Sequence, residues 1–170
     1  MPRALDYYRA DAEPARIEEP PEPGTRLGAA AGLDGLGDVA AAARLRPQHH
    51  IVVVGRDSLS LALDLWRAGF VNVGCAPRSL DCVAHGAADA LIVDRAPEGP
   101  DLGRIITRSR FMLRDGGWLL LHLPQGGGRA LLPALKALLD AAGFVLGMGL
   151  CDADGRWITA QRRRPALRLV

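Results

Sequence analysis

The sequence predicts a single α/β domain with three layers: a doubly wound, mostly parallel sheet that ends in an antiparallel hairpin. The length of 170 residues fits one domain. Short β-branched runs such as Ile51–Val54, typical of strands buried on both faces, alternate with segments of helical periodicity. Near the C-terminus, two apolar runs flank Asp152–Gly155, a strong hairpin signal. Strands that alternate with helices imply right-handed crossovers, which build a doubly wound sheet.

The bulk composition narrows the classes of partner. The net charge of +2 gives no global field for nucleic acid, so a nucleic-acid partner is not expected. The longest apolar run, Trp118–Leu123, is far too short to span a bilayer, so no membrane partner is expected either. Residues 1–13 contain no apolar leader, and the three cysteines show no metal-binding spacing. We therefore expect a cytoplasmic protein whose cysteines are small core residues, with no metal site.

The chain divides into four parts by composition. Residues 1–37 are rich in proline, glutamate and glycine and predict a flexible or extended tail. Residues 38–47 predict a short helix that Asp38 caps and Pro47 stops. Residues 48–164 form the α/β domain, and residues 165–170 are a second tail. The last 70 residues are more basic than the rest, which indicates either a solvated rim, the simpler interpretation, or a surface for an anionic partner.

The first half of the domain is predicted to hold two strands and two helices. After Ile51–Val54, Ser58 is a candidate N-cap for a helix that ends at Gly69. The spacing of Leu59, Ala62, Leu63 and Trp66 indicates that these residues form its apolar, inward face. A strand over 71–75 follows, and then a short helix from Pro77 to about residue 85.

The second half repeats the pattern and ends in the hairpin. A buried strand over 90–93 ends at Asp94, and a helix with inward-facing residues such as Ile106 follows. Asp115–Gly117 predicts a turn into a strand over 118–123. A helix over 129–142 is predicted to bury a leucine stripe, and strands over 144–150 and 156–163 complete the hairpin. The apolar stripe of that helix is Leu131, Leu132, Leu135, Leu138 and Leu139.

Two segments carry a resemblance to a known family. Phe111–Leu120 is similar to the "L-x-x-G-G-x-h-h" entry into the fifth strand of class I S-adenosylmethionine (SAM) methyltransferases. Leu138–Phe144 resembles the helix end and "G-F" entry into the sixth strand of that family. The resemblance covers roughly residues 48–164. It implies a methyltransferase-like sheet in which the third strand is missing or shrunken between His85 and Asp89.

The resemblance also implies a site for SAM, in a degraded form. The first turn of the family reads acidic-x-G-x-G-x-G, and here only Gly55 matches: Val53 replaces the acid, and Asp57 and Leu59 replace the later glycines. We expect strain where a replaced glycine needs a positive φ, and crowding of the cofactor. The acid that holds the ribose is absent from 73–77. The candidate cofactor-binding residues are Gly55, Arg56, Asp57, Ser58, Ala76 and Asp94.

Three functions remain open at this point. The degraded loop favours a catalytically inactive relative that serves as a binding or regulatory module for a small molecule or protein, or as a homodimer through an exposed sheet edge or helix. An active small-molecule or protein methyltransferase with a divergent loop is the alternative. A receiver-like signalling domain is a third, since Gly55–Asp57 and Ala90–Asp94 resemble its acidic pocket and phosphoacceptor strand.

Two further side-chain groups have simple interpretations. An isolated histidine within an apolar strand, His122, predicts a hydrogen-bonded core or rim residue rather than a general base. Asp94 is able either to touch a ligand or to cap the loop that follows it. The basic triplet Arg162–Arg164 is interpreted as a solvated strand end. No catalytic residue is assigned.

Overall fold

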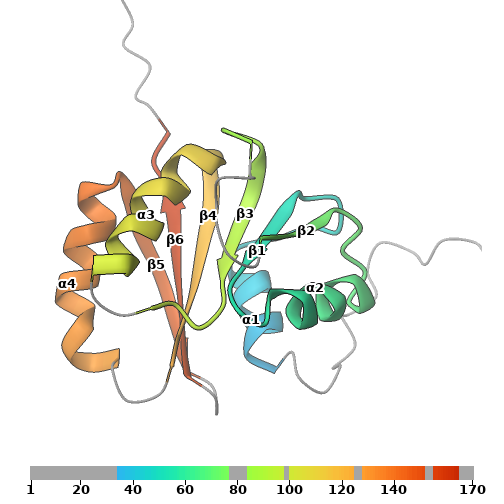
Figure 1. Ribbon diagram of the computed structural model, residues 1–170, viewed down its shortest axis with the longest axis horizontal. Helices are drawn as coiled ribbons and strands as arrows, with labels where there is room; N and C mark the ends of the chain where they lie inside the picture. Colours follow the sequence, from blue (N-terminus) through green and yellow to red (C-terminus); the bar gives the residue numbers. More distant parts are fainter. Residues whose placement is uncertain (1–33, 77–83, 98–99, 125–127, 152–154, 165–170) are drawn as a thin grey trace, which may run out of the picture.

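The computed structural model describes residues 34–76, 84–97, 100–124, 128–151 and 155–164. They form three layers, with a central sheet between two pairs of helices (Figure 1). The predicted helix from Pro77 and the turn at 152–154 fall largely outside these residues. The elements in chain order are α1 (Asp34–Ala42), β1 (Ile51–Val54), α2 (Ser58–Arg67), β2 (Val73–Ala76), β3 (Ala88–Val93), α3 (Pro100–Met112), β4 (Leu113–Pro124), α4 (Gly128–Ala141), β5 (Phe144–Cys151) and β6 (Gly155–Arg162).

The sheet has six strands in the order β2-β1-β3-β4-β6-β5. The first four strands in that order run parallel to one another, and β6 runs antiparallel between β4 and β5. This arrangement confirms the predicted mostly parallel sheet with its terminal hairpin. It also shows that the receiver-like alternative was wrong, because that fold requires parallel strands throughout. Strand β2 lies at one edge and β3 lies on the other side of β1, so the described residues contain no third strand beyond β2.

Each face of the sheet has its own core. Leu102 and Ile106 of α3 and Leu135 and Leu139 of α4 pack against one face. The other face carries α1 and α2, which bury residues such as Val39 and Leu65. Because side chains alternate along a strand, neighbouring residues of the buried strands enter opposite cores. In β1, Val52 and Val54 lie on the α3–α4 side and Ile51 and Val53 lie on the α1–α2 side.

The first helix differs from its prediction in position. It begins at Asp34 rather than Asp38, and it ends at Ala42, well before Pro47. Asp38 therefore lies inside the helix and is exposed instead of capping it. Leu36, which was assigned to the tail, is buried in the core on this face. The chain leaves the helix through Arg44, whose φ of 50° breaks the helical path.

The second helix buries a different face from the one predicted. Ser58, Ala62 and Leu65 are buried, whereas Leu59, Leu63 and Trp66 are exposed. Both sets have the i, i+4, i+7 spacing of a helical stripe, so the spacing cannot choose between them. Of the four residues predicted to face inward, only Ala62 does so, and Leu65 supplies the large buried side chain of the helix. The N-cap is Asp57 rather than Ser58, and its side chain makes no capping hydrogen bond.

Strand β4 begins earlier than predicted and includes the predicted turn. The strand begins at Leu113, which pairs with Ala88, but the next pair is Trp118 with Ala90. The residues between them bulge away from β3, and Gly116 there has a φ of +78°. Asp115–Gly117 therefore lies in a bulge inside β4, whereas the sequence predicted a turn before the strand.

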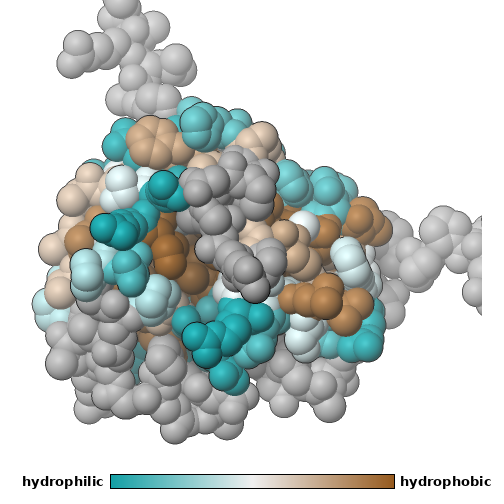
Figure 2. All heavy atoms as spheres, viewed as in Figure 1, coloured by the Kyte–Doolittle hydropathy of each residue, from teal (hydrophilic) through white to brown (hydrophobic). Residues whose placement is uncertain are grey.

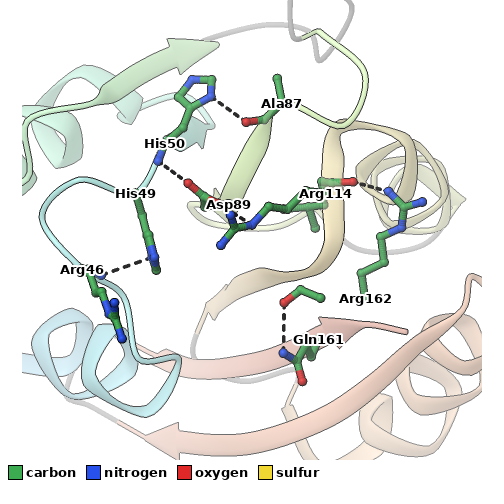
Figure 3. Close-up of polar contacts among 10 residues, drawn as sticks. Arg46, His49, His50, Ala87, Asp89, Arg114, Gln161 and Arg162 are labelled. Atoms are coloured by element: carbon green, nitrogen blue, oxygen red, sulfur yellow. Dashed lines mark hydrogen bonds and ion pairs between the residues drawn. The ribbon is translucent and has the colours of Figure 1, made fainter. Parts of the chain in front are cut away.

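Ion pairs and hydrogen bonds stabilise the amino edge of the sheet (Figure 3). The Asp89 carboxylate accepts a hydrogen bond from the backbone N–H of His50 at 2.7 Å and pairs with Arg114 Nε at 2.5 Å. The Arg162 guanidinium pairs with Asp115 at 2.9 Å, and Arg163 pairs with Asp140 at 3.2 Å. Two arginines of the basic triplet are therefore engaged by carboxylates of the same chain.

One carboxyl at this end of the molecule titrates abnormally. Lys136 donates a hydrogen bond to Asp140 at 2.7 Å and, together with the charge of Arg163, lowers the pKa of that carboxyl. The group is exposed, so its effect on stability is small. No helix among the described residues is long and apolar enough to cross a membrane.

Neighbouring leucines of α4 test the assignment of the core. Leu139 is fully buried, whereas Leu138, predicted to lie in the same stripe, is 40% exposed. We expect Leu139→Ala to lower the free energy of unfolding by about 2–5 kcal/mol because it opens a cavity. Leu138→Ala should cost less than about 1 kcal/mol. Urea denaturation of both variants measures the difference, and equal losses would contradict this packing.

Candidate functional site

The carboxyl ends of β1, β3 and β4 bring chemically useful residues into one row. Val54 pairs with Val93, and Val93 pairs with Leu121, so the next residues along these strands lie side by side. These residues are Gly55, Asp94 and His122. Across the antiparallel pairing, His122 also lies opposite Trp157 of β6. The backbone N–H of Asp94 donates to the carbonyl of Val54 at 2.8 Å and continues the β1–β3 ladder to this row.

Gly55 is the one position in the turn after β1 that requires glycine. Its φ is +141°, a conformation that side chains disfavour. A Cβ at this position would lie only 2.7 Å from the backbone carbonyl oxygen of Asp94. Backbone cannot yield as a flexible side chain can. The close approach of the two strand ends at this edge of the sheet therefore depends on Gly55.

The other two replaced glycines cause no backbone strain. Asp57 has a φ of −101°, and Leu59 lies within α2. The expectation of strain at these positions was wrong, because the turn reaches helical geometry directly after Gly55. Leu59 is 61% exposed, so its side chain does not pack into the core.

The carboxylate of Asp57 instead changes the electrostatics of the turn. Its Oδ2 lies 3.7 Å from Nη1 of Arg95, which follows Asp94 in the loop after β3. The pair bridges the ends of two neighbouring strands. Both side chains are more than half exposed, so the bridge contributes at most about 1 kcal/mol. A ligand that entered here would meet one carboxylate and one guanidinium, and Arg56 adds an exposed cation beside them.

Ser58, at the start of α2, and Ala76, at the end of β2, are buried next to the row of Gly55, Asp94 and His122. The Ser58 side chain is buried, and its Oγ has no hydrogen-bond partner. Ala76 is buried at the end of β2, where it pairs with Val54. The described residues place no acid at that strand end. The first turn of α2 nevertheless presents backbone N–H groups and the positive end of a helix dipole.

Asp94 holds His122 in a fixed orientation. Asp94 Oδ1 lies 3.1 Å from Nδ1 of His122, and both side chains are close to nine-tenths buried. The carboxylate selects the tautomer that carries its proton on Nδ1. The imidazole also stacks on the indole of Trp157, with the ring centroids 4.6 Å apart and the planes 14° apart. Among the described residues, the Asp94 side chain therefore binds His122.

The other ring nitrogen of His122 is left without a partner. Nε2 is buried and makes no hydrogen bond. In the tautomer that Asp94 selects, this atom is an acceptor. An unsatisfied buried acceptor costs about 1–3 kcal/mol, so it is normally paired with a protein group, a water or a ligand. The arrangement can accept a hydrogen bond or a proton from an O–H or N–H group placed against it.

The six residues predicted from the sequence do not form one cluster. Gly55 and Asp94 are in direct contact. Asp57 forms an ion pair with Arg95, the residue that follows Asp94. Ser58 and Ala76 are buried below the turn, and Arg56 is exposed. The prediction that His122 is a hydrogen-bonded core or rim residue is confirmed.

Sequence reasoning missed two residues of this site. Arg95 and Trp157 were not identified, although a charged residue directly after the Asp94 strand end was a usable signal. No signal in the sequence pointed to Trp157, because antiparallel register alone brings it to His122.

The residues at this edge fit SAM only in part. The resemblance implies an acid before Gly55, but Val53 stands there and is fully buried. It also implies an acid at the end of β2, where Ala76 stands. Two lost charged hydrogen bonds, at about 1.5–3 kcal/mol each, would weaken binding about 100-fold or more. At these two positions, the described residues supply neither of the carboxylates that the resemblance implies. Those residues also contain no cluster of three metal-ligating side chains.

Comparisons with known proteins identify the fold. No protein-family model matches the chain, and no curated protein is detectably similar to it. A Galdieria sulphuraria protein provisionally described as a sarcosine dimethylglycine methyltransferase matches with a TM-score of 0.60 and 11% identity, over 75% of this chain and 83% of that chain. The 1,6-didemethyltoxoflavin-N1-methyltransferase of Burkholderia thailandensis, solved with S-adenosylhomocysteine, matches with a TM-score of 0.51 and 14% identity, over 73% and 76%.

A further match shows how widely this fold is used. SpnF, described as a 4+2 cyclase, matches with a TM-score of 0.53 and 15% identity, over 74% of this chain and 78% of that chain. At such low identities the similarity establishes the fold alone. The chain has the class I SAM-dependent methyltransferase fold, and the reaction has to be argued from its own residues.

Alanine substitutions at two glycines test the close approach of Gly55 to Asp94. We expect Gly55→Ala to lower the free energy of unfolding by about 2 kcal/mol or more, because of its positive φ and the close carbonyl of Asp94. Gly37→Ala is the control: it lies in α1 with no atom within 4 Å of an added Cβ, and alanine should stabilise that helix by up to about 1 kcal/mol. Urea denaturation of both variants measures these changes. A harmless Gly55→Ala would show that the strand ends are not in contact.

Proposed function

We propose that this protein is a catalytically inactive member of the methyltransferase fold that acts as a binding or regulatory module. The observation that carries the proposal is the loss of charge complementarity in the turn after β1. Where the resemblance implies a glycine, Asp57 carries a carboxylate that pairs with Arg95. Where it implies acids, Val53 and Ala76 are buried and apolar.

The ligand of such a module would still bind at the row of Gly55, Asp94 and His122. The glycine keeps the strand ends in contact, the start of α2 offers backbone donors, and His122 Nε2 offers a buried acceptor. SAM or its demethylated product is a candidate ligand, with weak affinity. The carboxylate of Asp57 would repel the carboxylate of their amino acid part.

Titration calorimetry of the full chain with SAM and with its demethylated product tests this proposal. We expect dissociation constants weaker than about 100 μM. Asp57→Asn removes the like charge and keeps the side-chain size, so it should strengthen binding by about 3- to 5-fold, the equivalent of an exposed charge interaction. Asp57→Gly also removes the side chain and should strengthen binding at least as much.

A matched pair elsewhere provides the control. Asp101 and Arg104 of α3 form an exposed pair with the same 3.7 Å separation, far from this turn in sequence. Asp101→Asn should leave the affinity unchanged. Wild-type binding much tighter than about 100 μM, or weaker binding by Asp57→Gly, would contradict the proposal and the placement of the ligand.

An active methyltransferase with a divergent loop is a second candidate, and one observation favours it. The Asp94–His122 pair leaves a buried acceptor nitrogen at the carboxyl edge, which is the arrangement that a proton acceptor needs. A small-molecule or protein substrate could donate a hydrogen bond or a proton to this nitrogen from an O–H or N–H group.

Radiolabelled SAM incubated with the protein and with fractionated cell extract separates the two candidates. Label transfer that is abolished in His122→Gln and kept in Asp101→Asn would establish an enzyme. If wild type transfers no label to any fraction while it remains folded, the inactive module stands.

A further inference from the structure

One flank of α2 carries an apolar stripe that is exposed in the described part of the chain. Leu59 is 61% exposed, Leu63 is 38% exposed and Trp66 is 45% exposed. Their i, i+4, i+7 spacing aligns them along one side of the helix. Val71, in the connection to β2, is 76% exposed and extends the apolar surface. Figure 2 shows hydrophobic, brown surface over the region of α2.

Among the described residues, the strand beside this stripe has an unpaired edge. Within the described part of the chain, β2 is the last strand of the sheet and pairs only with β1. Its sequence, Val73-Gly74-Cys75-Ala76, contains no charge and no proline. Protein sheets usually protect an edge strand with one of these features, because its unpaired N–H and C=O groups attract another strand. This edge lacks both.

The stripe and the open edge face the same way. Each residue of the stripe directly follows a buried residue of α2, so the stripe is rotated by about 100° from the buried face. The helix connects the parallel strands β1 and β2 through a right-handed crossover. In that geometry, a rotation by one residue turns the stripe outward beyond β2 and away from α1.

We propose that a second copy of this chain docks on this surface through a twofold axis. In this dimer, β2 pairs antiparallel with β2 of the other copy, and the two α2 stripes meet above the joined strands. Strands in a sheet lie about 4.8 Å apart, and α2 packs on both β1 and β2. The two helices would then lie about 10 Å apart, which is the distance of helices in direct contact.

This spacing is the reason to choose a second copy over an unrelated strand. A foreign strand would satisfy the edge of β2 and leave the stripe exposed to water. A second copy brings a strand and an apolar helix flank together, and a twofold axis makes the surface complementary to itself. The helix has only ten residues, so the contact is small and the dimer should form with a micromolar dissociation constant. The proposal does not depend on SAM binding.

Sedimentation velocity of the full chain from about 1 to about 200 μM tests the dimer. We expect wild type to pass from monomer to dimer in this range. Trp66→Glu and Leu63→Glu place a charge in the stripe and should each weaken dimerisation at least about tenfold. The matched control is Leu138→Glu on α4, where an equally exposed leucine lies on the opposite face. It should leave the dissociation constant unchanged.

Crosslinking tests the geometry directly. In a chain whose Cys75, Cys82 and Cys151 are replaced by alanine, Leu63→Cys should give a covalent dimer with a short bismaleimide, whereas Leu138→Cys should not. A monomer at all concentrations would overturn the proposal. A dimer that resists both glutamate variants, or that crosslinks through residue 138, would overturn it as well. Circular dichroism of each variant checks that the protein is still folded when it no longer dimerises.

Discussion

The parallel pairing of β1, β3 and β4 is the constraint on which the candidate site depends. It ends all three strands at one edge, and the hydrogen bond from Asp94 N–H to the Val54 carbonyl carries the ladder into the loops. Gly55 can approach Asp94 because it has no Cβ. His122 then lies within reach of the Asp94 carboxylate, although 28 residues separate them. The register of the sheet thus positions Gly55, Asp94 and His122, because each of them directly follows a paired strand residue.

The sequence predicted what depends on local signals. Buried β-branched runs such as Ile51–Val54 marked the strands, and glycine-rich breaks marked their ends. It could not predict which flank of α2 is buried. The buried Ser58, Ala62 and Leu65 repeat with the same period as the exposed Leu59, Leu63 and Trp66. Nor could it predict the stacking of His122 on Trp157, which requires the register of two antiparallel strands. Tertiary packing decided both features.

Compared with the motif that the family resemblance implies, the turn after β1 differs more in charge than in backbone geometry. Asp57 sits at a negative φ and serves as the N-cap position of α2, so the turn folds without the glycine that the family resemblance implies. What it introduces is a carboxylate, which Arg95 partly neutralises. The stability of the fold rests on the buried strands, whereas binding of a cofactor would depend on the few groups at this turn. The chain accordingly shares its fold with solved structures at 11–15% identity.

The same helix links the altered turn to the proposed dimer. Leu59 stands where the family resemblance implies the last glycine of the motif, and its side chain points out along the exposed stripe with Leu63 and Trp66. A glycine there would remove apolar surface from the stripe and would cost α2 about 1 kcal/mol in helix propensity. The substitution that departs from the cofactor motif thus adds to the surface beside the open edge of β2. An inactive module that pairs through this flank would be under selection to keep Leu59, whereas an enzyme that closes its backbone around SAM would be under selection to lose it.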